Sequence, residues 1–395
     1  MKDKGYGITK EELYHIQEIK NKIHEKPELS NQEYETTRFI KHELEKLDGI
    51  EFIALPIKTG IVSRIKGKMP GKTIALRADI DGIAQNEEAE VTIKSQVPGM
   101  MHACGHDFHT ACLLGAALVL SRLRRNLCGD IILIFQPAEE TTTGAQMLIE
   151  AGLLKKIHID AIFGMHNRPE IPVGQVVVKE GSLMAAKSNF RIIVHGVGGH
   201  GSMPHKCEDP IICAAALIEG IQTIVSRNTD PFEPIVISIG SIHGGSTENL
   251  IVDKVEMTGS MRVLSEQVRQ NAMKRLLNLV RGIAQTYGCT SELIIEETLP
   301  PVENNKPMIE IARKAAINTV GIDQIVTSQP SMASEDFSIF MEKIPGFFYW
   351  IGSGKTNETC YAWHNSKFST NDKALETGAN LLVQAVIVAA EELTI

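Results

Sequence analysis

The chain has 395 residues, which is long for a single hydrophobic core and predicts two domains. Hydrophobic residues make up 43% of it and charged residues 22%, the balance of a soluble globular protein. The net charge of −8 and the pI near 5.9 argue against nucleic acid as a partner.

The first twenty residues are rich in charge and contain no apolar run, so we expect no secretory signal peptide. We also expect no membrane span, because no apolar stretch reaches the roughly 18 residues that a span requires. The seven cysteines are an odd number without CxxC pairs, which indicates reduced thiols. These features predict a cytoplasmic protein.

The first part of the chain combines helical patterns with short apolar strands. Residues 9–26 and 32–47 have the spacing of amphipathic helices, and Pro27 ends the first of them. A third helix, apolar on all sides, is predicted at residues 110–123. Three apolar strands are predicted within residues 73–79, 129–140 and 159–166.

Each of these strands ends in side chains that can bind a metal or carry a proton. Asp79 and Asp81 follow the first strand, Glu139 and Glu140 the second, and His166 ends the third. In an open α/β sheet, ligands collect beyond the carboxyl ends of the strands. We therefore expect these five residues to lie close together.

The pattern changes near residue 187 and changes back after residue 298. Between these points half-exposed strands are predicted at 189–195, 234–242 and 254–263, with helices at 210–226 and 265–287. Beyond them, helices are predicted at 307–319 and 372–392 and a strand at 347–352. The prediction is an α/β catalytic domain with a central, mostly parallel sheet flanked by helices, interrupted by an inserted α+β domain. The first comprises residues 1–186 and 298–395, and the second residues 187–297.

Residues 101–110, MHACGHDFHT, hold the densest group of potential metal ligands. Cys104 and His106 suit Zn²⁺ and neighbouring first-row metals, and Gly105 makes a bend between them inexpensive. Taken alone, such a stretch is more often a polar loop before a helix with one buried thiol. The complete set of candidate ligands comprises Cys104, His106, Glu139, Glu140, His166 and His364. Each member taken singly also has an ordinary explanation as an exposed or hydrogen-bonded polar residue.

Nine motifs in order along the chain resemble the M20 metallopeptidase family, in particular its amidohydrolase branch of aminoacylases, hippurate hydrolases, N-acetyl-diaminopimelate deacetylases and auxin-conjugate hydrolases. They are HEKPELSNQE (24–33), ALRADIDGI (75–83), MHACGHDFHT (101–110), FQPAEE (135–140), GMHNRP (164–169), GGHGSMPH (198–205), ENLIVDKVEMTGSMR (248–262), SEDFS (334–338) and WHNSKF (363–368).

The resemblance implies two divalent metal ions that share Cys104. Glu140 and His364 would complete the first ion, and His106 and His166 the second. A bridging thiolate is chemically sound, because a metal-bound thiol is deprotonated. Asp79 and Asp81 are then expected to orient the ligands rather than to bind metal.

Glu139 matches the position of the general base in the same family. Being next to the ligand Glu140, it could take a proton from the attacking water and pass it to the leaving amine. The competing interpretation is a more distant structural carboxylate.

The inserted domain resembles the lid and dimerisation domain of the family. His200 matches the histidine that stabilises the oxyanion in a neighbouring subunit, and Asn249 and Arg262 match residues that contact a substrate carboxylate. Without the resemblance, His200 would be an incidental turn residue, and Arg262 could equally form a structural salt bridge.

The resemblance as a whole implies a cytoplasmic, homodimeric enzyme that hydrolyses N-acetyl or aryl-acyl amino acids or short peptides. Mn²⁺ is favoured by analogy, and Zn²⁺, Co²⁺ or Ni²⁺ also suit the donors. Two alternatives remain open, namely an aminopeptidase or dipeptidase and a catalytically silent metal-binding homologue. The sequence leaves the acyl group and the amino acid undetermined.

Overall fold

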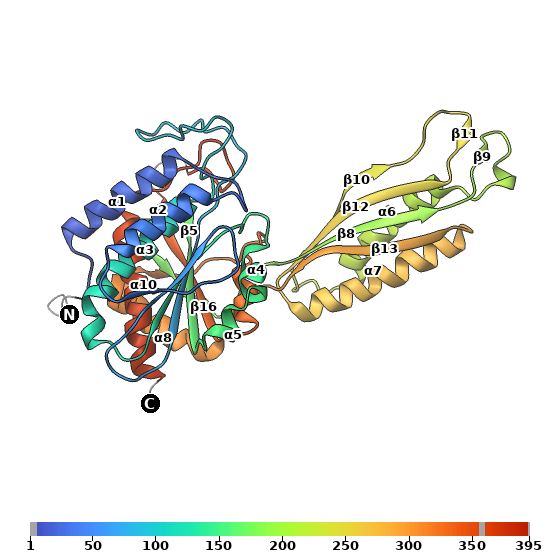
Figure 1. Cartoon of the computed structure of the whole chain (residues 1–395). Coiled ribbons are helices and arrows are strands. Elements are labelled where there is room, and N and C mark those ends of the chain that lie inside the picture. Colours follow the sequence, from blue (N-terminus) through green and yellow to red (C-terminus); the bar gives the residue numbers. More distant parts are fainter. Residues whose placement is uncertain (1–5, 355–359, 394–395) are drawn as a thin grey trace. The chain divides into compact units, whose positions relative to one another are not determined.

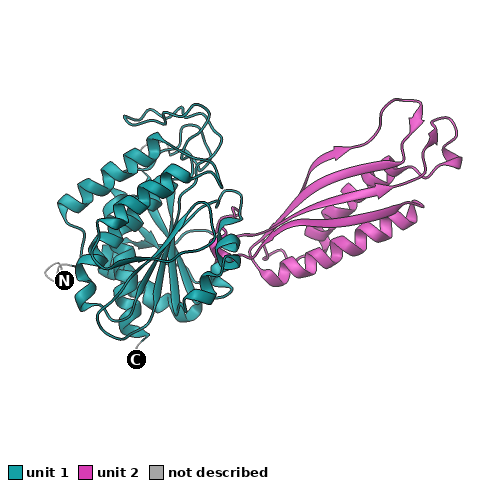
Figure 2. Cartoon of the chain, viewed as in Figure 1, with its two compact units in different colours: residues 1–181, 303–329, 339–395 teal, residues 182–302, 330–338 magenta. Residues whose placement is uncertain are grey.

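The computed structural model describes residues 6–354 and 360–393, so the first five residues of the charged N-terminal stretch lie outside it. The chain forms two compact units (Figure 2). Unit 1 comprises residues 1–181, 303–329 and 339–395, and unit 2 comprises residues 182–302 and 330–338. The second unit therefore starts five residues before the expected boundary, ends five residues after it, and includes the separate segment 330–338.

Unit 1 is built on an eight-stranded, mixed but mainly parallel sheet (Figure 1). Its strands, in spatial order, are β1 (Ile50–Phe52), β2 (Ile61–Ile65), β4 (Ile131–Gln136), β3 (Ile74–Asp79), β5 (Ala161–Pro172), β16 (Gly346–Gly354), β6 (Val176–Val177) and β15 (Ile325–Val326). The four central strands β4, β3, β5 and β16 run parallel, which confirms the predicted fold class.

Helices cover this sheet on both faces, which explains why its central strands are apolar throughout. The helices of unit 1 are α1 (Lys10–Glu25), α2 (Tyr34–Glu45), α3 (His106–Leu123), α4 (Gly144–Glu150), α5 (Leu153–Lys156), α8 (Lys306–Val320) and α10 (Ala374–Glu392). In β4, Ile131, Leu133 and Phe135 belong to the main core with α1, α3 and α10, while the alternate residues Ile132 and Ile134 are buried on the opposite face.

Local capping explains where several helices begin. Thr9 and Glu12 form a capping box at the start of α1, with reciprocal hydrogen bonds of 2.7 and 3.2 Å. The helix predicted at 110–123 starts four residues earlier than expected, at His106, because Gly105 takes a left-handed conformation with φ of +86°.

Unit 2 is a four-stranded antiparallel sheet whose one face is covered by two helices. The strands, in spatial order, are β10 (Ile235–His243), β12 (Lys254–Val263), β8 (Ala186–His195) and β13 (Thr290–Leu299), and the helices are α6 (Pro210–Asn228) and α7 (Glu266–Thr286). A second, two-stranded sheet pairs β9 (Gly199–His200) with β11 (Leu250–Ile251). Three short elements lie where the chain passes between the units, β7 (Gly181–Met184), β14 (Val302–Asn304) and α9 (Phe337–Met341).

Two helices, α6 and α10, are long and apolar enough by composition to cross a membrane, which the sequence analysis did not anticipate. Most of the apolar window of α10 is buried in unit 1, where the helix packs against α3 and α8. Helices in the cores of soluble proteins pass the same compositional test, so these two are weak evidence for a membrane.

Candidate active site

The candidate residues of unit 1 collect at the carboxyl ends of β3, β4 and β5. Asp79 pairs with Gln136 across β3 and β4, which places Glu139 and Glu140 in the loop that follows at the same edge. Arg77 pairs with Gly164 across β3 and β5, so Asp79, two residues further on, is level with His166. The strand register therefore brings three distant segments of the sequence to one place.

Cys104 and His106 are supplied by the loop that leads into α3. The bend at Gly105 lets the thiol and the imidazole of these neighbours approach the same region, as the sequence predicted. A side chain at residue 105 would meet Asn167 Nδ2 at 2.4 Å. That amide nitrogen donates a hydrogen bond of 2.6 Å to the carbonyl of Cys104, so the bend is fixed from β5.

Five side chains form two groups of potential ligands that share one sulfur atom. In the first group, the ligand atoms of Cys104, Glu140 and His364 all lie within 4.8 Å of one another, and in the second group those of Cys104, His106 and His166 do so. Cys104 Sγ is 3.4 Å from His166 Nε2, and His364 Nε2 is 3.2 Å from Glu140 Oε2. This is the grouping that the resemblance implied.

His364 reaches the group from a surface loop near the C-terminus. Its side chain is 55% exposed, whereas the other four candidate ligands are buried or nearly so. Its backbone is left-handed, with φ of +64°, and its N–H donates to the carbonyl of Ala103 at 2.9 Å. The loop is thus tied to the segment that carries Cys104.

Hydrogen bonds select the tautomers that expose Nε2 of both buried histidines. His166 Nδ1 donates to the carbonyl of Asn167 at 2.8 Å, which leaves Nε2 facing the Cys104 sulfur. His106 Nδ1 donates to Asp81 Oδ1 at 3.1 Å. In both rings Nε2 is the atom available to a metal.

The charges around these two rings differ. Burial lowers the pKa of His166 well below its usual value, so this ring is neutral. Burial also disfavours the charged form of His106, but the charge of Asp79 and the hydrogen bond to Asp81 outweigh it and raise the pKa of His106 to about 10. A cation that binds at His106 Nε2 must therefore displace a proton.

The donor set fits a pair of divalent ions. Among the described residues, His106 Nε2 and Glu140 Oε1 are buried without a hydrogen-bond partner, and they lie 3.8 Å apart. Burying two such atoms without partners costs folding free energy, unless a third species bonds to both. One thiol, three imidazoles and a carboxylate are donors that suit Zn²⁺, Mn²⁺, Co²⁺ or Ni²⁺.

Glu139 lies beside both ligand groups. Its carboxylate is buried, and Oε2 is 3.8 Å from His106 Nε2, in a group that also includes Glu140. This is the place in which a proton acceptor for an attacking water would be needed. A metal pair with an adjacent carboxylate is typical of metal-dependent hydrolases.

Asp79, the last residue of β3, and Asp81 are both buried, and both pair with the candidate ligand His106. Asp81 accepts hydrogen bonds from His106, from the hydroxyl of Ser30 at 2.6 Å and from the N–H of Glu140 at 3.0 Å. Burial alone would raise the pKa of Asp79, but His106 and His109 lower it well below its usual value.

Sequence analysis assigned no role to His109, which is part of this network. His109 Nδ1 donates to Asp79 Oδ1 at 2.6 Å, and its Nε2 accepts the N–H of Asn167 at 2.9 Å. The signal that could have identified it is its spacing, because a residue three positions after His106 lies on the same face of α3. Arg77 was missed as well, since it lies inside an otherwise apolar strand, where it bonds to Asp79 at 3.0 Å.

The candidate residues of unit 2 lie in two separate places. His200 and Asn249 are neighbours, because His200 pairs with Leu250 between β9 and β11 and the carbonyl of Asn249 accepts the N–H of Gly201 at 2.8 Å. Arg262 lies near the opposite end of β12, where its guanidinium donates to the hydroxyl of Ser334. The structure therefore brings His200 and Asn249 together but not Arg262.

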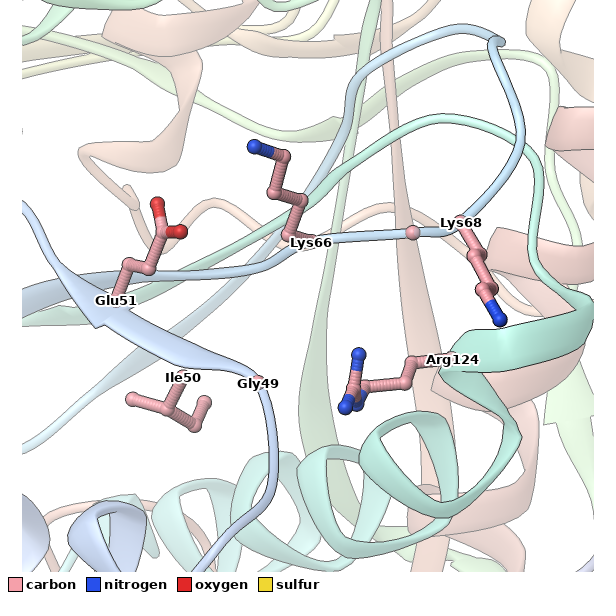
Figure 3. Close-up of a pocket in the computed structure, with 7 residues that line it drawn as sticks. Gly49, Ile50, Glu51, Lys66, Lys68 and Arg124 are labelled. Atoms are coloured by element: carbon pink, nitrogen blue, oxygen red, sulfur yellow. The ribbon is translucent and has the colours of Figure 1, made fainter.

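A hollow of about 480 Å³ in unit 1 does not belong to this site. It is lined by Gly49, Ile50, Glu51, Lys66, Gly67, Lys68 and Arg124 (Figure 3). Ile65 of β2 pairs with Ile131, the first residue of β4, so the hollow lies at the amino end of β4, away from the candidate ligands.

Known proteins are similar to this chain in sequence and fold. Peptidase family M20/M25/M40 matches residues 75–387 of the chain. An N-acetylcysteine deacetylase of Bacillus subtilis is 40% identical over 374 residues, which cover 94% of this chain and 96% of the relative. Thermostable carboxypeptidase 2 of Saccharolobus solfataricus is 41% identical over 370 residues, 92% of both chains. The crystal structure of the Bacillus subtilis YXEP protein, a dinuclear metal-binding peptidase, matches with a TM-score of 0.85 and 37% identity, covering 98% of this chain and 100% of that one.

The fold and these similarities place the chain among the metal-dependent hydrolases that act on amide or peptide bonds. More specifically, it belongs to peptidase family M20/M25/M40.

Proposed function

We propose that the protein hydrolyses the amide bond of N-acyl amino acids, with unit 1 as the catalytic domain and unit 2 as the lid and dimerisation domain. The observation that carries the proposal is the sharing of Cys104 between two ligand groups, with Glu139 beside them. The N-acetylcysteine deacetylase supports the choice of substrate class, because it is similar to this chain over almost its whole length.

The candidate residues of unit 1 have distinct roles in the proposed reaction. A pair of divalent ions held by Cys104, His106, Glu140, His166 and His364 would acidify a water molecule and polarise the amide carbonyl. Glu139 accepts the proton of the attacking water and delivers it to the nitrogen of the leaving amine. Asp81 keeps His106 in the tautomer that can bind metal.

Residues of unit 2 would recognise the substrate. Arg262 can hold a carboxylate with two parallel hydrogen bonds, and Asn249, which lies beside His200 and away from Arg262, would add one more from the neighbouring subunit. His200 would stabilise the oxyanion in a neighbouring subunit, which requires a dimer. The exposure of His200 and Asn249 on the short sheet of β9 and β11 is consistent with contact to another molecule.

A homodimer through unit 2 is supported by the apolar surface of this unit. Strand β10 is an edge of its sheet, and Val236 and Ile242 on it are 46% and 48% exposed. On α6, which packs beside β10, Ile211 and Ile212 are also exposed. Surfaces of this kind favour association with a second copy.

The proposal also includes the identity of the metal and the location of the protein. Mn²⁺ is our choice by analogy with the family, although the thiol also suits Zn²⁺. A cytoplasmic location is consistent with the odd number of cysteines and the absence of CxxC pairs.

A carboxypeptidase is the second candidate function. The similarity to thermostable carboxypeptidase 2 favours it, at 41% identity. Both reactions cleave an amide whose amine side is an amino acid with a free carboxylate, so the same site chemistry serves either. They differ in what lies on the acyl side, a small acyl group or a peptide.

Substrate panels decide between these two functions. Metal-stripped protein is resupplied with Mn²⁺, Zn²⁺ or Co²⁺ and assayed on N-acetyl and N-benzoyl amino acids and on peptides ending in the same amino acids. Faster turnover of the acyl amino acids supports the proposal, and faster turnover of peptides supports the carboxypeptidase. The absence of turnover on every pairing, with metal bound, would overturn both.

A further inference from the structure

The motif at residues 24–33 has no role in the function proposed above, although it lies against the loops that carry the candidate site. His24 donates a hydrogen bond of 2.8 Å to Asp107, at the start of α3. The Ser30 hydroxyl bonds to Asp81, which follows β3. Glu33, the last residue of the motif, accepts a hydrogen bond from the N–H of Ala138, which follows β4. One short segment thus contacts three loops of the candidate site.

Within this segment, Glu33 is the residue that bonds to the immediate neighbour of the proposed general base, Glu139. Its carboxylate is fully buried, and Oε1 accepts the N–H of Ala138 at 2.8 Å and that of Asn31 at 2.9 Å. Burial raises the pKa of Glu33. Ala138 immediately precedes Glu139, so Glu33 fixes the backbone from which the Glu139 side chain projects.

The loop that carries Glu139 needs such support, because its backbone is strained. Ala138 and Thr142 both have left-handed conformations, with φ of +57° and +56°, which residues with a Cβ atom rarely adopt. The loop closes through the N–H groups of Thr142 and Gly144, which bond to the carbonyls of Glu139 and Ala138 at 2.6 and 3.1 Å.

Two carboxylates from remote parts of the chain hold the N–H groups on either side of Glu139. Glu33 accepts a hydrogen bond from the N–H of Ala138, and Asp81 accepts one from the N–H of Glu140 at 3.0 Å. Both anchors act on the backbone, so they fix the origin and direction of the Glu139 side chain. Small displacements of a catalytic group are enough to lower turnover substantially.

We propose that Glu33 is a positioning residue for Glu139. It holds Ala138 in its left-handed conformation and so keeps the general base at a fixed place beside the ligand groups. The inference rests on the role of Glu139 in the proposed function, but its structural part, the immobilisation of residues 137–143, can be measured separately.

Three variants of Glu33 test the proposal. Glu33→Ala should lower kcat about 10- to 100-fold, with KM and bound metal unchanged, because a displaced base loses proton transfer rather than binding. Glu33→Gln should stay within about threefold of the wild type, because its amide oxygen accepts the same two N–H groups. Glu33→Asp, which is one methylene shorter, keeps the test available if the alanine variant does not fold, and should also lose kcat.

Hydrogen exchange gives a readout that does not depend on turnover. Amides of residues 137–143 should exchange faster in Glu33→Ala or Glu33→Asp than in the wild type, and at the wild-type rate in Glu33→Gln. The matched control is Glu43→Ala, since Glu43 is a buried carboxylate of α2 that is bonded to His15 and Lys46. This control should lose thermal stability but keep kcat and the exchange of residues 137–143.

Wild-type kcat and exchange in folded Glu33→Ala or Glu33→Asp would overturn the positioning role, as would equal losses in Glu33→Gln and Glu33→Ala. If the wild type is inactive on every substrate, the proposed function fails, and the exchange of residues 137–143 still decides whether Glu33 holds the loop.

Discussion

Except for His364, the candidate residues of unit 1 are buried or nearly so and are held by hydrogen bonds from distant parts of the chain, whereas His200 and Asn249 of unit 2 are exposed. Cys104 is fixed from Asn167, and His106 and Glu140 are both bonded to Asp81. By contrast, Nδ1 of the exposed His200 ring accepts the N–H of Ser202, two residues away, at 3.2 Å and lies 2.9 Å from the hydroxyl of the same serine, on a strand of two residues. This difference is what the proposed function requires, because ligand groups have to be preorganised before substrate arrives, whereas His200 is proposed to join the site on contact. Variants that change the candidate residues of one unit and leave those of the other intact test this difference.

The largest effect is expected from removing the shared thiol. Cys104→Ala takes a ligand from both groups at once, so turnover should fall to background and both ions should be lost on desalting, as measured by elemental analysis. Cys104→Asp should retain part of the metal, because a carboxylate can also bridge two ions. Cys128→Ala is the control and should keep both ions. Full metal content in Cys104→Ala would contradict the shared-ligand assignment.

Removal of the base should abolish chemistry without disturbing the metal. Glu139→Gln is expected to lower kcat by about 10²- to 10⁴-fold, the range of general acid–base catalysis, with unchanged metal content. Glu150→Gln, on the exposed end of α4, serves as the control. Retained turnover in the Glu139 variant would show that Glu139 is not the general base.

A smaller loss is expected from the exposed residue of unit 2. His200→Ala should lower kcat about 10²-fold, as expected for the loss of one oxyanion donor, and should leave metal affinity unchanged. Mixing the separately inactive Glu139→Gln and His200→Ala proteins should restore about a quarter of wild-type activity, because half of the random dimers contain one complete site out of two. No recovery on mixing would show that His200 does not act across subunits.

The smallest effect concerns stability and its dependence on pH. Burial disfavours the charged form of His24, but hydrogen bonds to Asp107 and Glu87 raise its pKa from 6.5 to about 9. A shift of this size is worth about 3 kcal/mol, at about 1.36 kcal/mol for each unit of pKa. Because the folded pKa is the higher one, this contribution is complete below pH 6.5 and disappears as the pH rises through 9.

Urea unfolding of the wild type and His24→Gln, both without metal, measures this contribution at pH 6 and pH 10. The difference in unfolding free energy between the two proteins should be largest at pH 6 and should shrink by pH 10. A difference that grows with pH would show that His24 is neutral in the folded protein.

The sequence predicted the parts of the site that follow from local patterns. Apolar runs ending in Asp79, Glu139 or His166 identified three central strands and the edge of the sheet where their ends meet. Glu33 could not be found in this way, because it acts on a backbone group 105 positions away and carries no periodic signal. The strand β13 was missed because its exposed residues alternate weakly, and segment 330–338 was not assigned to unit 2 because it joins that unit only in three dimensions.

The order of strands in the sheet of unit 1 has a consequence for biosynthesis. Strand β16 occupies an interior position between β5 and β6, although it leaves the ribosome after every other strand of this sheet. The loop that carries His364 and the helix α10, which packs on α3, emerge later still. Unit 2, except for residues 330–338, is complete before any of them. The nascent chain therefore carries four of the five candidate ligands before the sheet is complete, and the fifth, His364, joins them only after β16 has been made.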